Sequence, residues 1–129
     1  MKHCIPLLLL LLLLTACAAP AQPEAAYRQI GMEEAVAIME EEETYLILDV
    51  RTPEEFAAGH IPGAVNLPNE AIGSEEIALL PDKGQHILVY CRSGNRSKQA
   101  SEKLAALGYG NITEFGGILD WPGETIKDE

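Results

Sequence analysis

Short runs of apolar residues recur along the chain and alternate with longer polar segments. In residues 45–48 and 87–90 the apolar positions are consecutive, which is typical of strands buried on both faces of a parallel sheet. Each run is also shorter than an ordinary helix. The predicted strands cover residues 27–30, 45–48, 65–67, 86–90 and 112–115.

Most segments between these runs have the patterns of helices. Ala100 and Leu104 lie on one face of such a segment, at the spacing that helices require. Thr52 and Glu55 form a capping-box pattern around Pro53, and proline is favoured at the first helical position. The predicted helices cover residues 32–43, 53–58, 74–80 and 97–107.

Strands that alternate with helices predict a single α/β layered domain, here residues 27–129, with a mostly parallel sheet and right-handed crossovers. In such sheets, ligands bind at the carboxyl ends of the strands. Asp49 follows one predicted strand and Cys91 follows another. We therefore expect these two residues to face one crevice.

The first residues have the pattern of an export signal. Lys2 precedes an unbroken leucine run at 7–14, and the apolar stretch is shorter than the roughly 18 to 20 residues that span a bilayer. The sequence Leu14-Thr15-Ala16-Cys17 resembles the bacterial lipobox, in which cleavage falls just before an acylated cysteine. An ordinary secretory signal cut at a nearby alanine is the alternative, because both kinds of cleavage require small residues.

The lipobox interpretation divides the N-terminal part of the chain into two segments. Residues 1–16 are predicted to be a lipoprotein signal peptide that is removed, and residues 17–26 a lipidated Cys17 with an Ala/Pro tether. We therefore expect an exported protein whose membrane partner is reached through this lipid. The expected location is the periplasmic or extracytoplasmic face of a bacterial membrane.

Charge limits the partners. The chain has 9 Lys and Arg against 20 Asp and Glu, so its formal charge is −11, and loss of residues 1–16 would remove one lysine and give −12. This surface argues against nucleic acid, which binds clustered Lys and Arg. The glutamates at 40–43 are expected to be solvated and not to bind a metal. We expect a monomer that requires no metal and no cofactor.

Residues 91–97, Cys-Arg-Ser-Gly-Asn-Arg-Ser, lie between a predicted strand and a predicted helix. This order brings backbone N–H groups and a helix N-terminus toward the Cys91 thiol. Such surroundings, with nearby arginines, lower a cysteine pKa from about 8.5 toward roughly 3.5 to 7.5. We therefore identify Cys91 as a thiolate nucleophile. Cys4 lies in the signal and Cys17 is acylated in this interpretation, so Cys91 has no disulfide partner.

Several motifs resemble those of the single-domain rhodanese family, in the family's order, over residues 27–127. These motifs are Leu48-Asp49-Val50-Arg51, Glu54-Glu55-Phe56, Gly59-His60-Ile61-Pro62-Gly63-Ala64, Asn66-Leu67-Pro68, Tyr90 to Ser97, Leu107-Gly108-Tyr109, and Gly116-Gly117 with Trp121. The resemblance implies a five-stranded, mostly parallel sheet with helices on both faces. It also implies a thiosulfate-type sulfurtransferase in which Cys91 carries a persulfide and residues 92–97 form an amide cradle.

In the implied reaction, the Cys91 thiolate attacks the outer sulfur of a thiosulfate-like anionic donor, and sulfite leaves. Cyanide or a thiol then accepts the sulfur from the persulfide. Loop N–H groups stabilise the anionic states. The candidate substrate-binding residues are Arg92, Ser93, Gly94, Asn95, Arg96 and Ser97.

Other side chains have supporting or alternative roles. Arg96 either contacts the leaving sulfite oxygens or braces the loop from the direction of Asp49. Ser97 either caps the following helix or contacts the substrate. Asp49 and Arg51 are predicted to be braces, and His60 is predicted to hydrogen-bond within a turn.

Two other functions fit parts of the pattern. Cysteine phosphatases and arsenate reductases also place a thiolate in an anion-binding loop before a helix, but their pattern is Cys-x5-Arg. Arg96 comes five residues after Cys91, so the loop here is one residue shorter and favours a sulfur-sized group. The second alternative is a membrane-tethered persulfide relay or sulfur-binding module that passes sulfur to a partner, and the sequence leaves it open.

Overall fold

The computed structural model describes residues 26–128. The predicted signal peptide, Cys17 and nearly all of the tether lie outside these described residues. Within residues 26–128, no helix combines the length and the hydrophobicity needed to cross a membrane.

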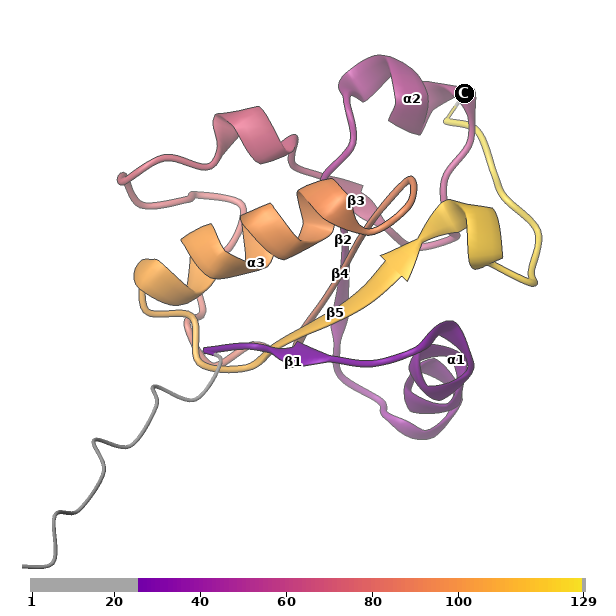
Figure 1. Cartoon of the computed structure of the whole chain (residues 1–129). Helices are drawn as coiled ribbons and strands as arrows, with labels where there is room; N and C mark the ends of the chain where they lie inside the picture. Colours follow the sequence, from indigo (N-terminus) through magenta and orange to yellow (C-terminus); the bar gives the residue numbers. More distant parts are fainter. Residues whose placement is uncertain (1–25, 129) are drawn as a thin grey trace, which may run out of the picture.

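A five-stranded parallel sheet forms the centre of the domain, in the order β1-β5-β4-β2-β3 (Figure 1). The strands are β1 (Arg28–Gln29), β2 (Leu46–Asp49), β3 (Val65–Asn66), β4 (Ile87–Cys91) and β5 (Ile112–Gly117). All five predicted strands are present, so the predicted α/β fold with a parallel sheet is confirmed. Every residue of β4 is buried, as expected for a central strand covered on both faces.

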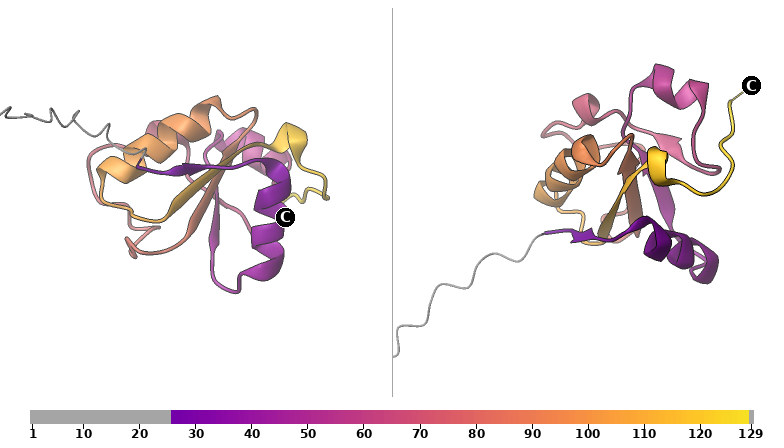
Figure 2. Two further views of the ribbon diagram at one scale, coloured as in Figure 1. Left: turned by 60° about the horizontal axis from the view of Figure 1, so that its bottom comes forward. Right: turned by 45° about the vertical axis from the view of Figure 1, so that its right-hand side comes forward.

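Helices cover both faces of the sheet (Figure 2). On one face, Ala100 and Leu104 pack with Leu48 and Val89 of the strands. On the other face, Ala35 is buried, and the partly buried Ile38, Met39 and Phe56 pack against the buried residues of that face. The helices are α1 (Met32–Glu41), α2 (Pro53–Ala58) and α3 (Asn95–Ala106), with the 3-10 turns η1 (Asn69–Ala71) and η2 (Ile118–Asp120).

The prediction of a helix at residues 74–80 is wrong. The chain there forms bends and turns between η1 and β4. Ile72 and Leu80 are nevertheless buried, because they pack individually into the core on the α3 side. The Tyr109 hydroxyl donates a 2.5 Å hydrogen bond to the Leu80 carbonyl, which fixes the end of this segment without a helix.

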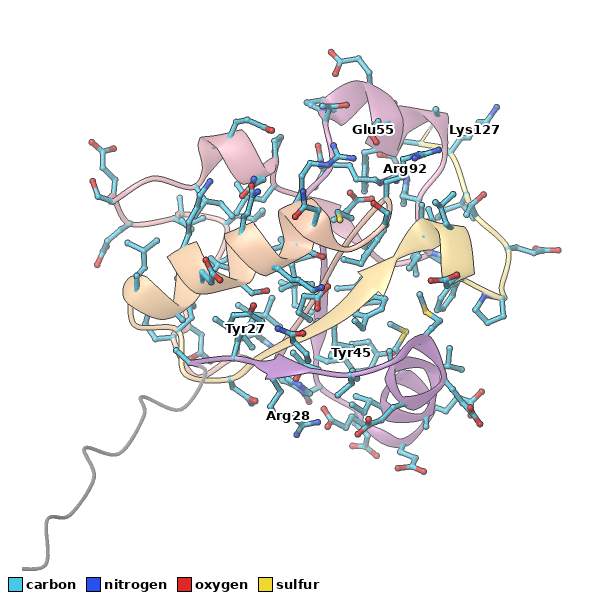
Figure 3. The ribbon with its side chains drawn as sticks, in the orientation of Figure 1. Tyr27, Arg28, Tyr45, Glu55, Arg92 and Lys127 are labelled. Carbon is cyan, nitrogen blue, oxygen red and sulfur yellow. The ribbon has the colours of Figure 1, made fainter. Side chains whose placement is uncertain are left out.

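The two ends of the sheet differ in what they carry. All strands are parallel, so the described chain enters at the amino end through β1, whereas the residues that follow β2 and β4 lie at the carboxyl end. Figure 3 shows this separation, with Tyr27 and Arg28 at one end of the molecule and Glu55 and Arg92 at the other. Asp49 and the Cys91 loop therefore lie at the end opposite the chain entry, but both residues are buried there, so the expectation that they face an open crevice is not met.

Candidate active site

Cys91 is the last residue of β4, and it pairs with Gly117 of β5. Only three residues separate it from α3, which begins at Asn95 and not at the predicted residue 97. Gly94 makes this short connection possible, since its φ of 111° lies in the left-handed region that glycine adopts without steric cost. Gly94 and not Ser97 therefore precedes the helix, and the prediction of Ser97 as a helix cap is wrong.

The Cys91 sulfur is buried, with 1% of the residue exposed, and is held by the loop that follows it. The Gly94 N–H donates to Sγ at 3.0 Å, and Sγ lies 3.4 Å from the Ser97 Oγ. Burial raises the pKa of the thiol, but its hydrogen bonds with the Ser97 hydroxyl and with the N–H groups of Ser97, Gly94 and Ser93 lower the pKa by more. The net effect places the pKa below its ordinary value of 9.0, so the geometry favours a thiolate.

Arg96 turns toward α2. Its guanidinium forms a two-pronged ion pair with Glu55, with Nη1–Oε1 at 2.6 Å and Nη2–Oε2 at 3.0 Å. Glu55 also closes the predicted capping box with Thr52, which the structure confirms. The expected brace from the direction of Asp49 is thus wrong, because Asp49 is occupied elsewhere, and Glu55 is the residue that holds Arg96.

Replacing Glu55 with Gln should remove this ion pair and lower the stability by about 1 kcal/mol at neutral pH. The hydrogen bond from Arg96 lowers the Glu55 pKa from 4.5 to about 2, despite partial burial. Because the native state favours the charged carboxylate, its contribution is complete above pH 4.5 and is lost as the pH falls toward 2. Urea unfolding of both proteins between these pH values measures the difference.

The control for this experiment is Glu54→Gln, which changes the same charge at the neighbouring, exposed position of α2. We expect the stability gap between the wild type and Glu55→Gln to shrink as the pH falls, and no such trend for Glu54→Gln. A gap that stays constant down to pH 2 would contradict the assigned ion pair.

Asp49 and Arg51 form a buried pair beneath the site. The Arg51 Nη2 lies 2.7 Å from Asp49 Oδ2 and also donates to the Gly59 carbonyl at 2.7 Å. The Tyr90 hydroxyl donates to the same Asp49 oxygen at 2.5 Å. Burial and this hydrogen bond raise the Tyr90 pKa, so the hydroxyl stays protonated. The network connects the ends of β2 and β4 with the turn after α2.

The remaining loop side chains differ in exposure. Arg92, Ser93 and Asn95 are exposed, whereas Gly94 and Ser97 are buried. Figure 3 shows Arg92 at the same end of the molecule as Glu55. Because Arg96 is bound to Glu55, Arg92 is the loop arginine that is free to meet an incoming anion.

Ser97 links the loop to β5. Its hydroxyl donates to the Glu114 Oε1 at 2.6 Å and also lies 2.9 Å from the Gly94 carbonyl. Glu114 is itself buried, with 2% exposed, and its Oε1 accepts the Gly116 N–H at 2.9 Å. The Ser97 hydroxyl therefore connects the buried carboxylate of Glu114 to the Cys91 sulfur.

His60 lies outside this arrangement. Its ring stacks on Phe56, its Nδ1 donates to the Phe56 carbonyl at 2.9 Å, and its Nε2 lies 3.3 Å from Asp128. His60 therefore hydrogen-bonds locally, but to the end of α2 and not within the predicted turn, and it also contacts the C-terminal segment. Among the residues that the structure describes, no cluster of His, Cys, Asp or Glu could hold a metal ion.

Sequence reasoning missed three residues of the site. The capping box already accounts for Glu55, so the sequence gives no reason to expect that Glu55 also forms an ion pair with Arg96. Tyr90 reads as an ordinary strand residue. Glu114 does carry a signal, because a carboxylate inside a predicted strand of the sheet is seldom buried without a specific partner.

The comparisons with known proteins agree with this geometry. The model of the rhodanese-like domain matches residues 32–124. The thiosulfate sulfurtransferase GlpE of Pseudomonas entomophila is 34% identical over 106 residues, which cover 78% of this chain and 94% of that protein. A sulfurtransferase of Allochromatium vinosum is 38% identical over 94 residues, covering 72% of this chain and 86% of that protein.

The relatives also include thiosulfate sulfurtransferase PspE of Escherichia coli, 37% identical over 73 residues, which cover 57% of this chain and 70% of that protein. Among solved structures, the rhodanese-like domain of the Anabaena Alr3790 protein aligns with a TM-score of 0.69 and 28% identity, covering 78% of this chain and 79% of that chain. The matched residues 32–124 contain the whole Cys91 loop and four of the five strands. The chain therefore belongs to the family of rhodanese-like domains.

Proposed function

We propose that this protein is a sulfurtransferase that takes a sulfur atom from thiosulfate, or a related anion, and delivers it to cyanide or a thiol. The Cys91 thiolate attacks the outer sulfur of the donor, the S–S bond of the donor breaks, and sulfite leaves with the bonding electrons. The resulting Cys91 persulfide then gives its outer sulfur to the acceptor. Relatives named thiosulfate sulfurtransferases support this assignment.

One observation carries the proposal: the Cys91 sulfur faces the N-terminus of α3 and accepts hydrogen bonds from its own loop. The same N–H groups that stabilise a thiolate are placed to stabilise the persulfide anion, since both are compact sulfur anions. Arg92, exposed at the edge of this loop, supplies local attraction for an anionic donor on an otherwise acidic protein.

The position of Arg96 argues against the phosphatase alternative. Such enzymes need a cation facing the oxyanion in the loop, and the guanidinium of Arg96 is instead bound to Glu55 by two hydrogen bonds. The connection from Cys91 to α3 is also only three residues long, which leaves little room for a tetrahedral oxyanion.

The direct test is turnover of the domain from Gln22 onward. Thiocyanate should form from thiosulfate and cyanide, and mass spectrometry should detect one added sulfur atom on the protein after thiosulfate alone. Hydrolysis of a phosphate monoester without any thiocyanate would instead support the phosphatase alternative.

We also propose that the full chain is anchored to the extracytoplasmic face of a bacterial membrane through Cys17. The support is the leucine run, the small residues before Cys17 and the polar tether after it. The sulfur acceptor would then be an extracytoplasmic thiol.

Replacement of Cys17 by Ala should abolish anchoring. The wild-type chain should enter the detergent phase and incorporate a labelled fatty acid, whereas Cys17→Ala should do neither, because acylation requires the thiol. Cys4→Ala is the matched control, since it removes a cysteine from the predicted signal and should leave labelling intact. Equal labelling of Cys17→Ala and the wild type would show that the lipobox assignment is wrong.

A further inference from the structure

Glu114 is a buried carboxylate that has no role in the proposed steps of sulfur transfer. It lies in β5 with 2% of the residue exposed, and among the ion pairs of the described residues none includes it. Its Oε1 accepts hydrogen bonds from the Ser97 hydroxyl and the Gly116 N–H. A buried carboxylate without a paired cation is costly unless its charge is moved or neutralised.

Ser97 stands between two acidic groups and has only one hydrogen to give. Its Oγ lies 2.6 Å from Glu114 Oε1 and 3.4 Å from Cys91 Sγ. When Glu114 is charged it takes the Ser97 hydrogen, and the Cys91 thiol donates its own hydrogen to Oγ. When Cys91 is charged, the Ser97 hydrogen turns to the sulfur, and a protonated Glu114 donates to Oγ. Both arrangements satisfy every hydroxyl, whereas two charged groups would compete for one hydrogen.

We propose that Cys91 and Glu114 share one proton through Ser97, so that the pair carries a single negative charge at neutral pH. To form the nucleophile, the S–H bond of Cys91 breaks and its proton binds to Ser97 Oγ. The original hydroxyl proton of Ser97 passes to Glu114 Oε1, and the electron pair stays on the sulfur. Glu114 is thus a positioning residue that stores the proton and acts on the sulfur through Ser97.

This exchange has a consequence for an anionic donor. Because one charge moves from Glu114 to Cys91, the thiolate forms without adding to the total negative charge of the site. A donor such as thiosulfate therefore meets no additional repulsion when the nucleophile appears. The inference rests on the proposed function only in taking Cys91 as the nucleophile, and its test measures the thiol itself and not turnover.

The surrounding charges come from several elements. A cavity of about 450 Å³ behind the loop is lined by Glu114, by Glu34 of α1 and by Lys98 of α3. These two flanking side chains have opposite charges, so their effects on Glu114 oppose each other, and Glu34 is also paired with Arg28 of β1 at 3.9 Å. On the other side of the loop, the positive charge of Arg96 also acts on Cys91 but is engaged by Glu55. None of these groups is placed to deliver a proton to the sulfur as directly as Ser97 is.

The first test follows the ultraviolet absorbance of the Cys91 thiolate during a pH titration of the domain. In the wild type we expect two steps, because the first charge is divided between sulfur and carboxylate and the second ionisation completes the thiolate. Glu114→Gln keeps an oxygen that accepts from Ser97 but cannot take a proton. It should lose the alkaline step and show a full thiolate after one step.

A merely structural role for Glu114 predicts a different result, since Gln would then leave the two proteins with the same titration curve. Glu34→Gln is the matched control, because it removes a carboxylate from the same cavity without touching Ser97. It should retain both steps. A single step in the wild type, or two steps in Glu114→Gln, would overturn the proposal.

The second test needs no variant that could fail to fold. Alkylation of Cys91 in the wild type removes the sulfur charge, so Glu114 should lose its proton at neutral pH. The infrared difference spectrum between free and alkylated protein should then show loss of a carboxylic acid band and gain of a carboxylate band. An unchanged carboxylic acid region would overturn the proposal, and it would do so even if the protein transfers sulfur normally.

Discussion

Cys91→Ala should reduce the formation of thiocyanate from thiosulfate and cyanide to the background rate. The sulfur of Cys91 is the atom that forms and breaks the covalent bond in the proposed reaction, and alanine offers no substitute. Loss of the nucleophile in a covalent mechanism costs on the order of 10⁶-fold in turnover. Steady-state turnover and the intact mass after thiosulfate treatment measure the two halves of this expectation.

Two further variants make the result interpretable. Cys91→Ser keeps a hydrogen-bonding side chain of similar size but cannot form a persulfide, so it should be equally inactive. Ser101→Ala changes a buried small residue that lies in α3 and not in the loop, and its hydroxyl has no hydrogen-bond partner among the described residues. It should keep full activity and unchanged or higher stability. Thiocyanate formation by Cys91→Ala at the wild-type rate would show that Cys91 is not the nucleophile.

Gly117→Ala should have the largest effect on stability of any single methyl group added near the site. A β-carbon on Gly117 would overlap the Arg92 carbonyl group and lie 2.5 Å from the Ser93 nitrogen. All of these atoms belong to the backbone of the catalytic loop, so no side chain can turn away to make room. We expect a loss of more than about 3 kcal/mol in the free energy of unfolding, with sulfur transfer lost in whatever fraction stays folded.

Gly73→Ala provides the matched control. No atom lies within 4 Å of a β-carbon at that position, and Gly73 does not adopt a left-handed φ. Thermal melting and turnover of both variants should separate the effect of the contact from the effect of replacing glycine. Wild-type melting and activity in Gly117→Ala would mean that the loop does not pack against β5 as the structure describes.

The strands were predictable because their burial follows from local composition. Residues 45–48 and 87–90 are apolar in succession, and short runs of this kind are typical of strands in a sheet covered on both faces. The capping box of Thr52 and Glu55 was predictable for the same reason, since its partners lie three residues apart. The segment at 74–80 was not, because a long-range hydrogen bond from Tyr109 fixes its end.

In the candidate site, the sequence identifies what lies within the loop but not what the loop contacts. Cys91, Gly94 and Ser97 are adjacent in sequence and also in space. The Arg96–Glu55 pair joins positions 41 residues apart, and the Ser97–Glu114 hydrogen bond joins positions 17 apart. Such pairings depend on how the crossovers bring α2 and β5 beside the loop, which no local pattern encodes.

The end of the sheet at which the described chain enters determines which terminus is suitable for immobilising the protein or fusing it to another protein. The described part of the chain enters at the amino end of β1, and the Cys91 loop lies beyond the carboxyl end of β4, a strand length or roughly 20 Å away. Toward the other terminus, Ile126 pairs with His60, and the last described residues lie beside α2 (Figure 1). A resin, reporter or carrier protein joined ahead of residue 26 therefore leaves the loop open to solvent. The same object joined after residue 128 would crowd the end of the molecule where Glu55 and Arg92 lie.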